Sequence, residues 1–285
     1  MTHTEYERSE RQLQRLAYRR RRARNGVLIA TASTLLVAVV VGFTVTHAPG
    51  WPRVKERFFS GADFAASFPD VLSGFWLNVK IFMIGEVCIL ALGLAVALAR
   101  SVRTPALFPL RILAIGYVDV FRGVPLLLVV FLVGFGVPAL NLTGVTSDPV
   151  ILGTAALVLS YSAYVAEVFR AGIESIHPSQ RAAARALGLK HHQAMRYVVI
   201  PQAVRRVAPP LLNDFVSLQK DSALVAVLGP LEAVRQAQIY ASGKFNFTSY
   251  AVAAIIFIAL TVPLARFTDR IAARTAHRQG PGGTA

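Results

Sequence analysis

A stretch of about 20 residues without any charge, 27–46, constrains the fold of this chain most strongly. That length of mostly apolar residues is enough for one helix to cross the hydrocarbon core of a membrane. Comparable stretches follow at about 74–99, 106–138, 149–168, 209–228 and 248–264. Of the 285 residues, 54% are hydrophobic and 16% are charged, which argues against an ordinary soluble enzyme. We therefore predict an all-α integral membrane protein with six transmembrane helices.

The basic residues predict how these helices are oriented. The chain has 30 Lys and Arg residues against 15 Asp and Glu, and cytoplasmic loops are enriched in Lys and Arg. Six spans place the arginine-rich segments 8–24, 100–111, 170–206 and 266–278 on one side. The other side then holds only Arg53, Lys55, Arg57, Arg235 and Lys244. We therefore expect both termini in the cytoplasm.

The arginine run at 19–22 allows two other interpretations. It could bind RNA or anionic lipid, but its role as a topology signal accounts for it, and we expect no nucleic-acid partner. A cleaved signal peptide has an apolar region of about 7–15 residues followed by an A-x-A-like site. The apolar run here is longer and no clear site of that kind follows, so we interpret 27–47 as an uncleaved, extra N-terminal helix.

Polar residues in the fifth stretch are candidates for a solute path. A charged side chain at the bilayer centre costs about 2.5–3.5 kcal/mol on insertion scales, so it is expected to face a cavity or a bundle interior. Asn213, Ser217 and Asp221 are spaced by four residues and share a helix face. Lys220 needs a partner elsewhere or a local break in the helix. A purely structural role inside the bundle is the alternative.

The third stretch contains a second candidate, Asp119 with Arg122. The two residues are three apart and could pair on one helix face. Gly123 and Pro125 follow at once, and proline removes a backbone donor and disrupts the preceding turn. The pair either lines a solute path beside a kink or holds the bundle together.

The segment 167–207 is too polar to span and predicts two short cytoplasmic helices. Ser179 is a plausible N-cap for a helix over 180–187, and Gly188 suits the left-handed position that ends it. A second helix over 191–200 is expected to stop at Pro201. Two exposed helices around a glycine form a docking element for a partner.

This segment resembles the "EAA" loop of type I ABC importer permeases. That pattern is E-A-A, three residues, G, nine residues and I-x-L-P, and it is matched by Ala182-Ala183-Ala184, Gly188 and 198–201. The flanks are similar to permeases of the polar amino acid uptake family. They read SYSAYVAEVFRAGI (160–173), ALGL (186–189), IPQA (200–203), NDFVSLQKDSAL (213–224) and YVDVFRGVPLL (117–127). The resemblance covers about 74–270.

The resemblance implies a multi-pass subunit of a bacterial cytoplasmic (inner) membrane importer. Its expected partners are two copies of an ATP-binding cassette subunit, a second permease that is identical or homologous, and an extracytoplasmic solute-binding protein. The chain contains no G-x-x-x-x-G-K-[ST] phosphate loop, so ATP and Mg²⁺ are expected on the partner, and this chain is expected to be no enzyme and to bind no cofactor. The residues expected to contact the ATPase are Ala182, Ala183, Ala184, Leu187 and Gly188.

One position departs from the family pattern, because Ala182 replaces the usual glutamate. If Ser179 caps the helix, Ala182 is at the third helical position, where a glutamate could complete a capping box. Its loss would cost about 1 kcal/mol by analogy with cap substitutions. The change removes a polar contact and leaves the helix and the glycine turn intact.

The expected organisation is a tail at 1–26, the extra helix at 27–47, an extracytoplasmic segment at 48–73, a permease domain at 74–270 and a tail at 271–285. The alternatives are a secondary transporter or channel driven by an ion gradient, a type I permease for another small solute, and a membrane scaffold. We find no internal repeat of the kind that secondary transporters show. His191 and His192 point about 100° apart on a helix without a third ligand nearby, so no metal site is expected.

Overall fold

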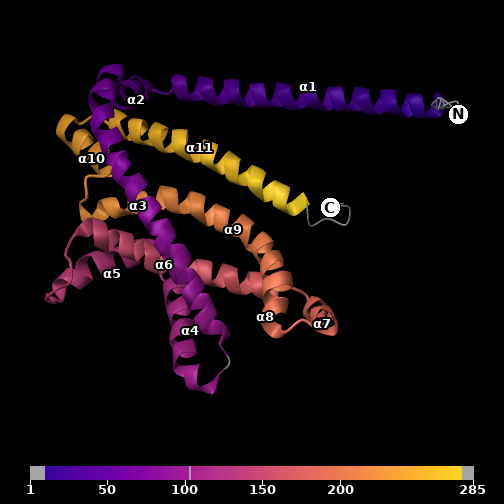
Figure 1. Cartoon of the computed structure of the whole chain (residues 1–285). Coiled ribbons are helices and arrows are strands. Elements are labelled where there is room, and N and C mark those ends of the chain that lie inside the picture. The colour runs from indigo at the N-terminus through magenta and orange to yellow at the C-terminus, as the bar shows by residue number, and fades with distance from the viewer. Residues whose placement is uncertain (1–9, 103, 278–285) are drawn as a thin grey trace. The chain divides into compact units, whose positions relative to one another are not determined.

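The computed structural model describes residues 10–102 and 104–277, and every regular element in these ranges is helical, as predicted. The chain divides into two compact units, Met1–Glu56 and Arg57–Ala285. The α-helices are α1 (Glu10–Thr46), α2 (Trp51–Phe58), α3 (Gly61–Ser101), α4 (Phe108–Gly123), α5 (Leu126–Ala139), α6 (Pro149–Glu174), α7 (Pro178–Ala186), α8 (His191–Ala194), α9 (Ile200–Asp221), α10 (Ala233–Lys244) and α11 (Thr248–His277) (Figure 1). The 3₁₀ turns are η1 (Pro105–Leu107) and η3 (Ser222–Leu228), and η2 (Met195–Val199) is a π-helical turn.

The first unit contains α1, which runs through the predicted extra span. Its apolar side chains between residues 27 and 45 are exposed. The hydroxyls of Thr34 and Thr44 donate to the carbonyls of Ala30 and Val40, one turn earlier, at 2.8 Å. A helix whose polar side chains are satisfied by its own backbone is suited to a hydrocarbon environment.

The second unit is built around α3, which packs against α6, α10 and α11. Ile89 of α3, Leu157 of α6 and Leu218 of α9 belong to one buried apolar cluster. Close approach of α3 and α6 requires a glycine, because a Cβ on Gly93 would lie 2.6 Å from Cγ1 of Val165. Small residues at helix contacts are the usual means of close packing in membranes.

Within the described ranges, four helical stretches are long and apolar enough to cross a membrane. They are Arg22–Thr46, Trp51–Ser101, Pro149–Glu174 and Thr248–Ala273. A fifth is present if the bent pair Pro105–Gly123 and Leu126–Ala139 forms one span. The predicted fifth stretch, 209–228, does not meet this test, because the polar residues of α9 lower its apolar character.

The predicted stretch 106–138 is helical but is not one helix, because it is broken at the Gly123–Pro125 disruption that the sequence predicted. It is two helices, α4 and α5, that meet at an angle of 109°. Val124 lies in extended conformation (φ −97°, ψ 131°) and Pro125 precedes α5. A residue before proline is pushed towards the extended region by the proline ring, so the chain turns sharply here.

The stretch 209–228 also differs from the prediction of one helix. The helix α9 begins nine residues earlier than predicted, at Ile200, and passes through Pro209 and Pro210. At Ser222 it changes to the 3₁₀ turn η3. The buried hydroxyl of Ser222 donates to the carbonyl of Gln219 at 2.8 Å, and side-chain bonds of this kind compete with the regular α-helical pattern.

The first helix predicted in the segment 167–207 begins two residues earlier than expected, at Pro178. His177 is the N-cap, and its Nδ1 accepts from the backbone N–H of Ser179 at 3.2 Å. Pro178 occupies the first helical position, where its missing N–H has no cost. Ala182 is therefore beyond the third helical position, and the capping-box explanation for its missing glutamate is wrong.

The predicted role of Gly188 in ending this helix is confirmed. Gly188 has φ +81°. Its N–H donates to the carbonyl of Arg185 at 2.9 Å, and the N–H of Leu189 donates to that of Ala184 at 3.1 Å. These two bonds define the Schellman motif, which requires a left-handed residue at this position.

The second helix predicted in the segment 167–207 does not stop at Pro201. The short α8 continues through η2 into α9, with Pro201 in the first turn of α9. The N–H of Ile200 donates to the carbonyl of Met195, five residues back, as in a π-helix. Because proline is tolerated in a first helical turn, the chain remains helical from α8 into α9.

Candidate functional site

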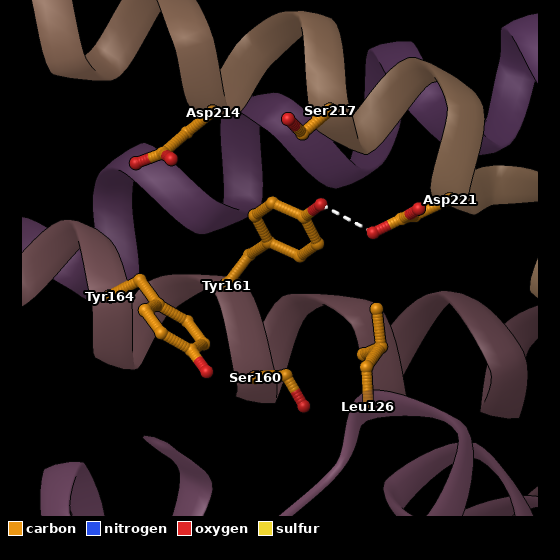
Figure 2. Close-up of a pocket in the computed structure, with 7 residues that line it drawn as sticks. All are labelled: Leu126, Ser160, Tyr161, Tyr164, Asp214, Ser217 and Asp221. Carbon is orange, nitrogen blue, oxygen red and sulfur yellow. Dashed lines mark hydrogen bonds between the residues drawn. The ribbon is translucent and has the colours of Figure 1, made fainter.

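A polar cavity of about 300 Å³ lies between the start of α5, the middle of α6 and the second half of α9. Its lining residues are Leu126, Ser160, Tyr161, Tyr164, Asp214, Ser217 and Asp221 (Figure 2). The hydroxyl of Tyr161 donates to Oδ2 of Asp221 at 2.6 Å. The cavity therefore has two carboxylates and several hydroxyl groups on its walls.

Helical spacing explains which residues meet in this cavity. Asp214, Ser217 and Asp221 follow one another at i, i+3 and i+7 on α9, and Tyr161 and Tyr164 are one turn apart on α6. Residues at these spacings share one face of a helix. The bend at Pro125 brings the first residue of α5, Leu126, to the same place.

The structure brings together only part of the predicted solute path. Ser217 and Asp221 line the cavity, whereas Asn213 lies in a smaller cavity of about 80 Å³ between α9 and α11. The side chain of Lys220 is exposed and lines neither of these two cavities. The sequence interpretation missed Asp214 and Tyr161, although the same helical spacing allowed a face through Asp214.

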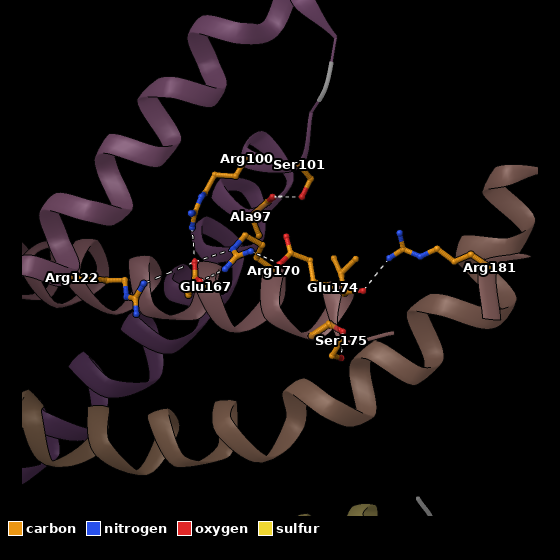
Figure 3. Close-up of polar contacts among 11 residues, drawn as sticks. Ala97, Arg100, Ser101, Arg122, Glu167, Arg170, Glu174, Ser175 and Arg181 are labelled. Carbon is orange, nitrogen blue, oxygen red and sulfur yellow. Dashed lines mark hydrogen bonds and ion pairs between the residues drawn. The ribbon is translucent and has the colours of Figure 1, made fainter. Parts of the chain in front are cut away.

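An ionic cluster ties three helices together at the end of α6 (Figure 3). Oε2 of Glu167 accepts from Nη1 of Arg100 on α3 at 2.7 Å and lies 4.0 Å from Nη1 of Arg122 on α4. Arg170 pairs with Glu167 one turn away and also with Glu174. The cluster therefore joins α3, α4 and α6.

The predicted pairing of Asp119 with Arg122 is wrong. Arg122 faces Glu167 instead, and its guanidinium lies 5.7 Å from the ring centre of Tyr164. Asp119 is exposed and makes no ion pair in the described part of the chain. In the folded bundle, Glu167 of α6 lies closer to the Arg122 guanidinium than Asp119 of α4 does. Residue spacing along α4 cannot predict this contact, because it depends on how α4 packs against α6.

The loop that follows α6, with α7 and α8, is attached to the same end of α6. Nη2 of Arg181 on α7 donates to the carbonyl of Ile173 at 3.0 Å, and Arg206 on α9 donates to that of Ser175. Among the predicted docking residues, Ala182, Ala183, Gly188 and Leu187 are exposed, with Leu187 at 82%. Ala184 is 3% exposed, so it packs inwards and is not available to a partner.

A second polar network was not predicted. Glu232, the N-cap of α10, is fully buried and accepts from Nδ2 of Asn78 on α3 at 2.9 Å and from the N–H of Arg235 at 2.6 Å. Nδ2 of Asn78 also donates to Ser222, and Oδ1 of Asn78 accepts from the N–H of Ala233. Burial raises the pKa of Glu232, against the lowering effect of the donors around it. The network positions α10 against α3 and the end of α9.

The cavity offers carboxylates and hydroxyls, the ionic cluster beside it offers arginines, and neither offers a set of metal ligands among the described residues. In residues 10–102 and 104–277, no three His, Cys, Asp or Glu side chains come together in a way that could hold a metal ion. The arrangement is suited to binding a polar solute, and the ionic cluster is suited to fixing helix positions.

Replacing Glu167 with glutamine is expected to destabilise the second unit by about 1–3 kcal/mol, because hydrogen bonds to charged groups are lost and Arg100 and Arg170 remain close together. Thermal unfolding of the detergent-purified protein measures this effect. Glu174→Gln is the matched control, since Glu174 is 62% exposed and has one partner, and exposed pairs contribute about 0–1 kcal/mol. Equal midpoints for the two variants would contradict a central role of Glu167.

Comparison with known proteins places the chain in one family. The family described as "Binding-protein-dependent transport system inner membrane component" matches residues 89–277. The "Probable glutamine ABC transporter permease protein GlnM" of Bacillus subtilis (strain 168) is 36% identical over 70% of this chain and 89% of its own length. The "Arginine transport system permease protein ArtQ" of the same organism is 33% identical over 71% of this chain and 92% of its own.

Solved structures agree with this result. The crystal structure of "an amino acid ABC transporter with histidines" has a chain that is 34% identical, with a TM-score of 0.66, over 72% of this chain and 94% of that one. The MetNI methionine ABC transporter shares the fold, with 18% identity and a TM-score of 0.59 over 72% of this chain and 95% of its own. The helix α1 lies outside the matched residues 89–277.

Proposed function

Since the chain belongs to the family of binding-protein-dependent transport system inner membrane components, we propose that it is the permease subunit of an importer that moves a polar amino acid across the cytoplasmic membrane. In this family a separate subunit hydrolyses ATP, so the chain is not an enzyme. The observation that carries the amino-acid assignment is that two relatives above 30% identity are named as glutamine and arginine permeases.

The proposed topology has six spans and both termini in the cytoplasm. Beyond the four or five apolar spans, α9 with η3 would be a polar span surrounded by the other helices. The distribution of Lys and Arg supports this arrangement. The proposed parts are the tail 1–26, the extra helix 27–47, the extracytoplasmic segment 48–73, the permease domain 74–270 and the tail 271–285.

The proposed partners are two ATP-binding subunits, a second permease subunit and an extracytoplasmic solute-binding protein. ATP and Mg²⁺ would be held by the ATP-binding subunits. We place the contact with them on the exposed part of the cytoplasmic loop, Ala182, Ala183, Leu187 and Gly188. An apolar side chain such as Leu187, 82% exposed, gains most from burial in a partner's groove.

The proposed solute path runs through the polar cavity. Ser217 and Asp221 of the predicted path line it, and Asp214 joins them. Its volume of about 300 Å³ is at the lower end of the range for small-molecule sites, roughly 300–1,000 Å³. We no longer place Asn213, Lys220 or Asp119 on the path.

Reconstitution tests the function directly. The permease, its ATP-binding subunit and its binding protein are placed in liposomes, and uptake of radiolabelled glutamine and arginine is measured with and without internal ATP. We expect uptake only with ATP, and none when the phosphate-loop lysine of the ATP-binding subunit is changed to alanine. An ionophore that collapses ion gradients should leave the uptake unchanged.

The same experiment decides between the proposal and its rivals. Uptake that needs an ion gradient and proceeds without ATP would identify a secondary transporter. ATP-dependent uptake of another solute, with no uptake of either amino acid, would leave the importer function and overturn the amino-acid assignment.

A further inference from the structure

We infer that Arg122 binds the α-carboxylate of the transported solute while Asp214 and Asp221 hold its ammonium group. The cavity would then recognise the ammonium and carboxylate groups that all α-amino acids share, and would make few specific contacts with the side chain. The inference rests on the proposed function, because it assumes that an amino acid passes through this cavity.

The walls of the cavity supply the negative half of this site. Asp214 and Asp221 line it, and no lysine or arginine does. Asp221 accepts one hydrogen bond, from Tyr161, and Asp214 makes no hydrogen bond or ion pair in the described part of the chain. Carboxylates that lack a cation in a partly buried cavity attract a positively charged ligand group.

A buried hydroxyl provides independent support for a ligand here. Ser160 lines the cavity and is 2% exposed, yet its Oγ has no hydrogen-bond partner among the described residues. A buried polar atom without a partner is costly, and such atoms are uncommon in native structures. A polar solute in the cavity would provide the missing partner.

Arg122 supplies the positive half. The ionic cluster contains Arg100, Arg122 and Arg170 against Glu167 and Glu174, so one positive charge is not balanced within it. Glu167 bonds closely to Arg100 and Arg170, whereas Arg122 stays 4.0 Å away and its side chain is 43% exposed. Figure 3 shows Arg122 reaching Glu167 from the side opposite Arg170.

Arg122 is connected to the cavity through Tyr164. Its guanidinium lies 5.7 Å from the centre of the Tyr164 ring, and Tyr164 lines the cavity (Figure 2). The hydroxyl of Tyr164 donates to the carbonyl of Arg122 at 3.4 Å. An arginine fork matches a carboxylate bidentately, so this partly exposed guanidinium is suited to a solute carboxylate.

The test compares ligands that differ by one charged group. Binding of radiolabelled L-arginine and of agmatine, which lacks the carboxylate, is measured on the detergent-purified permease–ATPase complex without the binding protein. Glutamine and 4-aminobutanamide form a second such pair. The variants are Arg122→Gln and Asp214→Asn. Arg111→Gln is the control, because Arg111 is an exposed residue of the same helix, α4.

We expect the wild type and Arg111→Gln to bind each amino acid about tenfold more tightly than its decarboxylated partner, as a hydrogen-bonded charge pair requires. Arg122→Gln should remove this difference by weakening the amino acids alone. Asp214→Asn should weaken both members of each pair. Equal binding of arginine and agmatine by the wild type, a uniform effect of Arg122→Gln, or no binding of either amino acid would overturn the inference. ATP-dependent uptake in liposomes would still support the proposed function in each of these cases.

Discussion

Replacing Gly74 with alanine is expected to lower the stability of the second unit by about 3 kcal/mol, at the upper end of overpacking effects. A Cβ at this position would lie 2.6 Å from the carbonyl carbon of Glu232 and 2.8 Å from the backbone nitrogen of Ala233. Both are backbone atoms, so no side-chain rotation can relieve the contact. The helix α10 would have to move away from α3, which would break the bond between Asn78 and Glu232.

Thermal unfolding in detergent measures this effect, and a fall of the midpoint by about 5–10 °C is expected for a domain of this size. Gly116→Ala is the matched control. Gly116 is a helical glycine of α4, and a Cβ there would meet nothing within 4 Å. A Gly74→Ala protein with the midpoint of the control would show that α10 does not pack as described.

Replacing Gly188 with valine is expected to abolish ATP-dependent uptake while the membrane-embedded helices remain folded. Gly188 has φ +81° and open space around it, so the cost arises from the backbone alone, about 1–2 kcal/mol for an L-residue in the left-handed region. The backbone strain is located in the turn that separates α7 from α8, and this turn holds Leu187 in its exposed position. In the proposed complex, a displaced turn no longer fits the groove of an ATP-binding subunit.

Gly144→Val separates this effect from backbone strain in general. Gly144 has φ +83° and nothing within 4 Å, but it lies in the loop between α5 and α6. Co-purification of the ATP-binding subunit and uptake in liposomes should both fail for Gly188→Val and persist for Gly144→Val. Retention of the subunit by Gly188→Val would contradict the proposed docking surface.

Much of this fold is predictable from sequence because some residues, such as glycine and proline, allow or exclude particular backbone conformations. Gly188 was recognised because few other residues adopt the conformation that ends a helix in this way. Pro125 was recognised as a point of disruption because its ring excludes a regular helix around it. The long apolar stretches are predictable because a helix that crosses the hydrocarbon core needs about 20 mostly apolar residues. The structure confirms four of the six predicted spans, or five if α4 and α5 form one span.

The remaining features depend on contacts between distant segments. Spacing shows that Asn213 and Ser217 share a face, and equally that Asp214 and Ser217 do, but only packing against α6 decides which face lines the cavity. Arg122 has a possible partner three residues away in Asp119, and it faces Glu167 because α4 lies beside α6. Pro201 predicts the end of a helix by sequence alone, whereas a π-helical turn before it lets the helix continue.

This continuity has a mechanical consequence. The 22 residues of α9 form a rod about 33 Å long, which carries Asp214 and Asp221 in its second half and joins the loop of α7 and α8 at its other end. Pro209 and Pro210 remove two backbone bonds near its midpoint, so the rod bends most easily there. A force at the loop end therefore reaches the cavity as a rotation about this flexure. A tilt of about 5° moves Asp221, at the far end of the rod, by roughly 1.5 Å and Asp214, closer to the flexure, by roughly 0.6 Å. A shift of the size reached at Asp221 is enough to make or break a hydrogen bond, so small movements at the loop end of α9 change the strength of the hydrogen bonds that this carboxylate makes in the cavity.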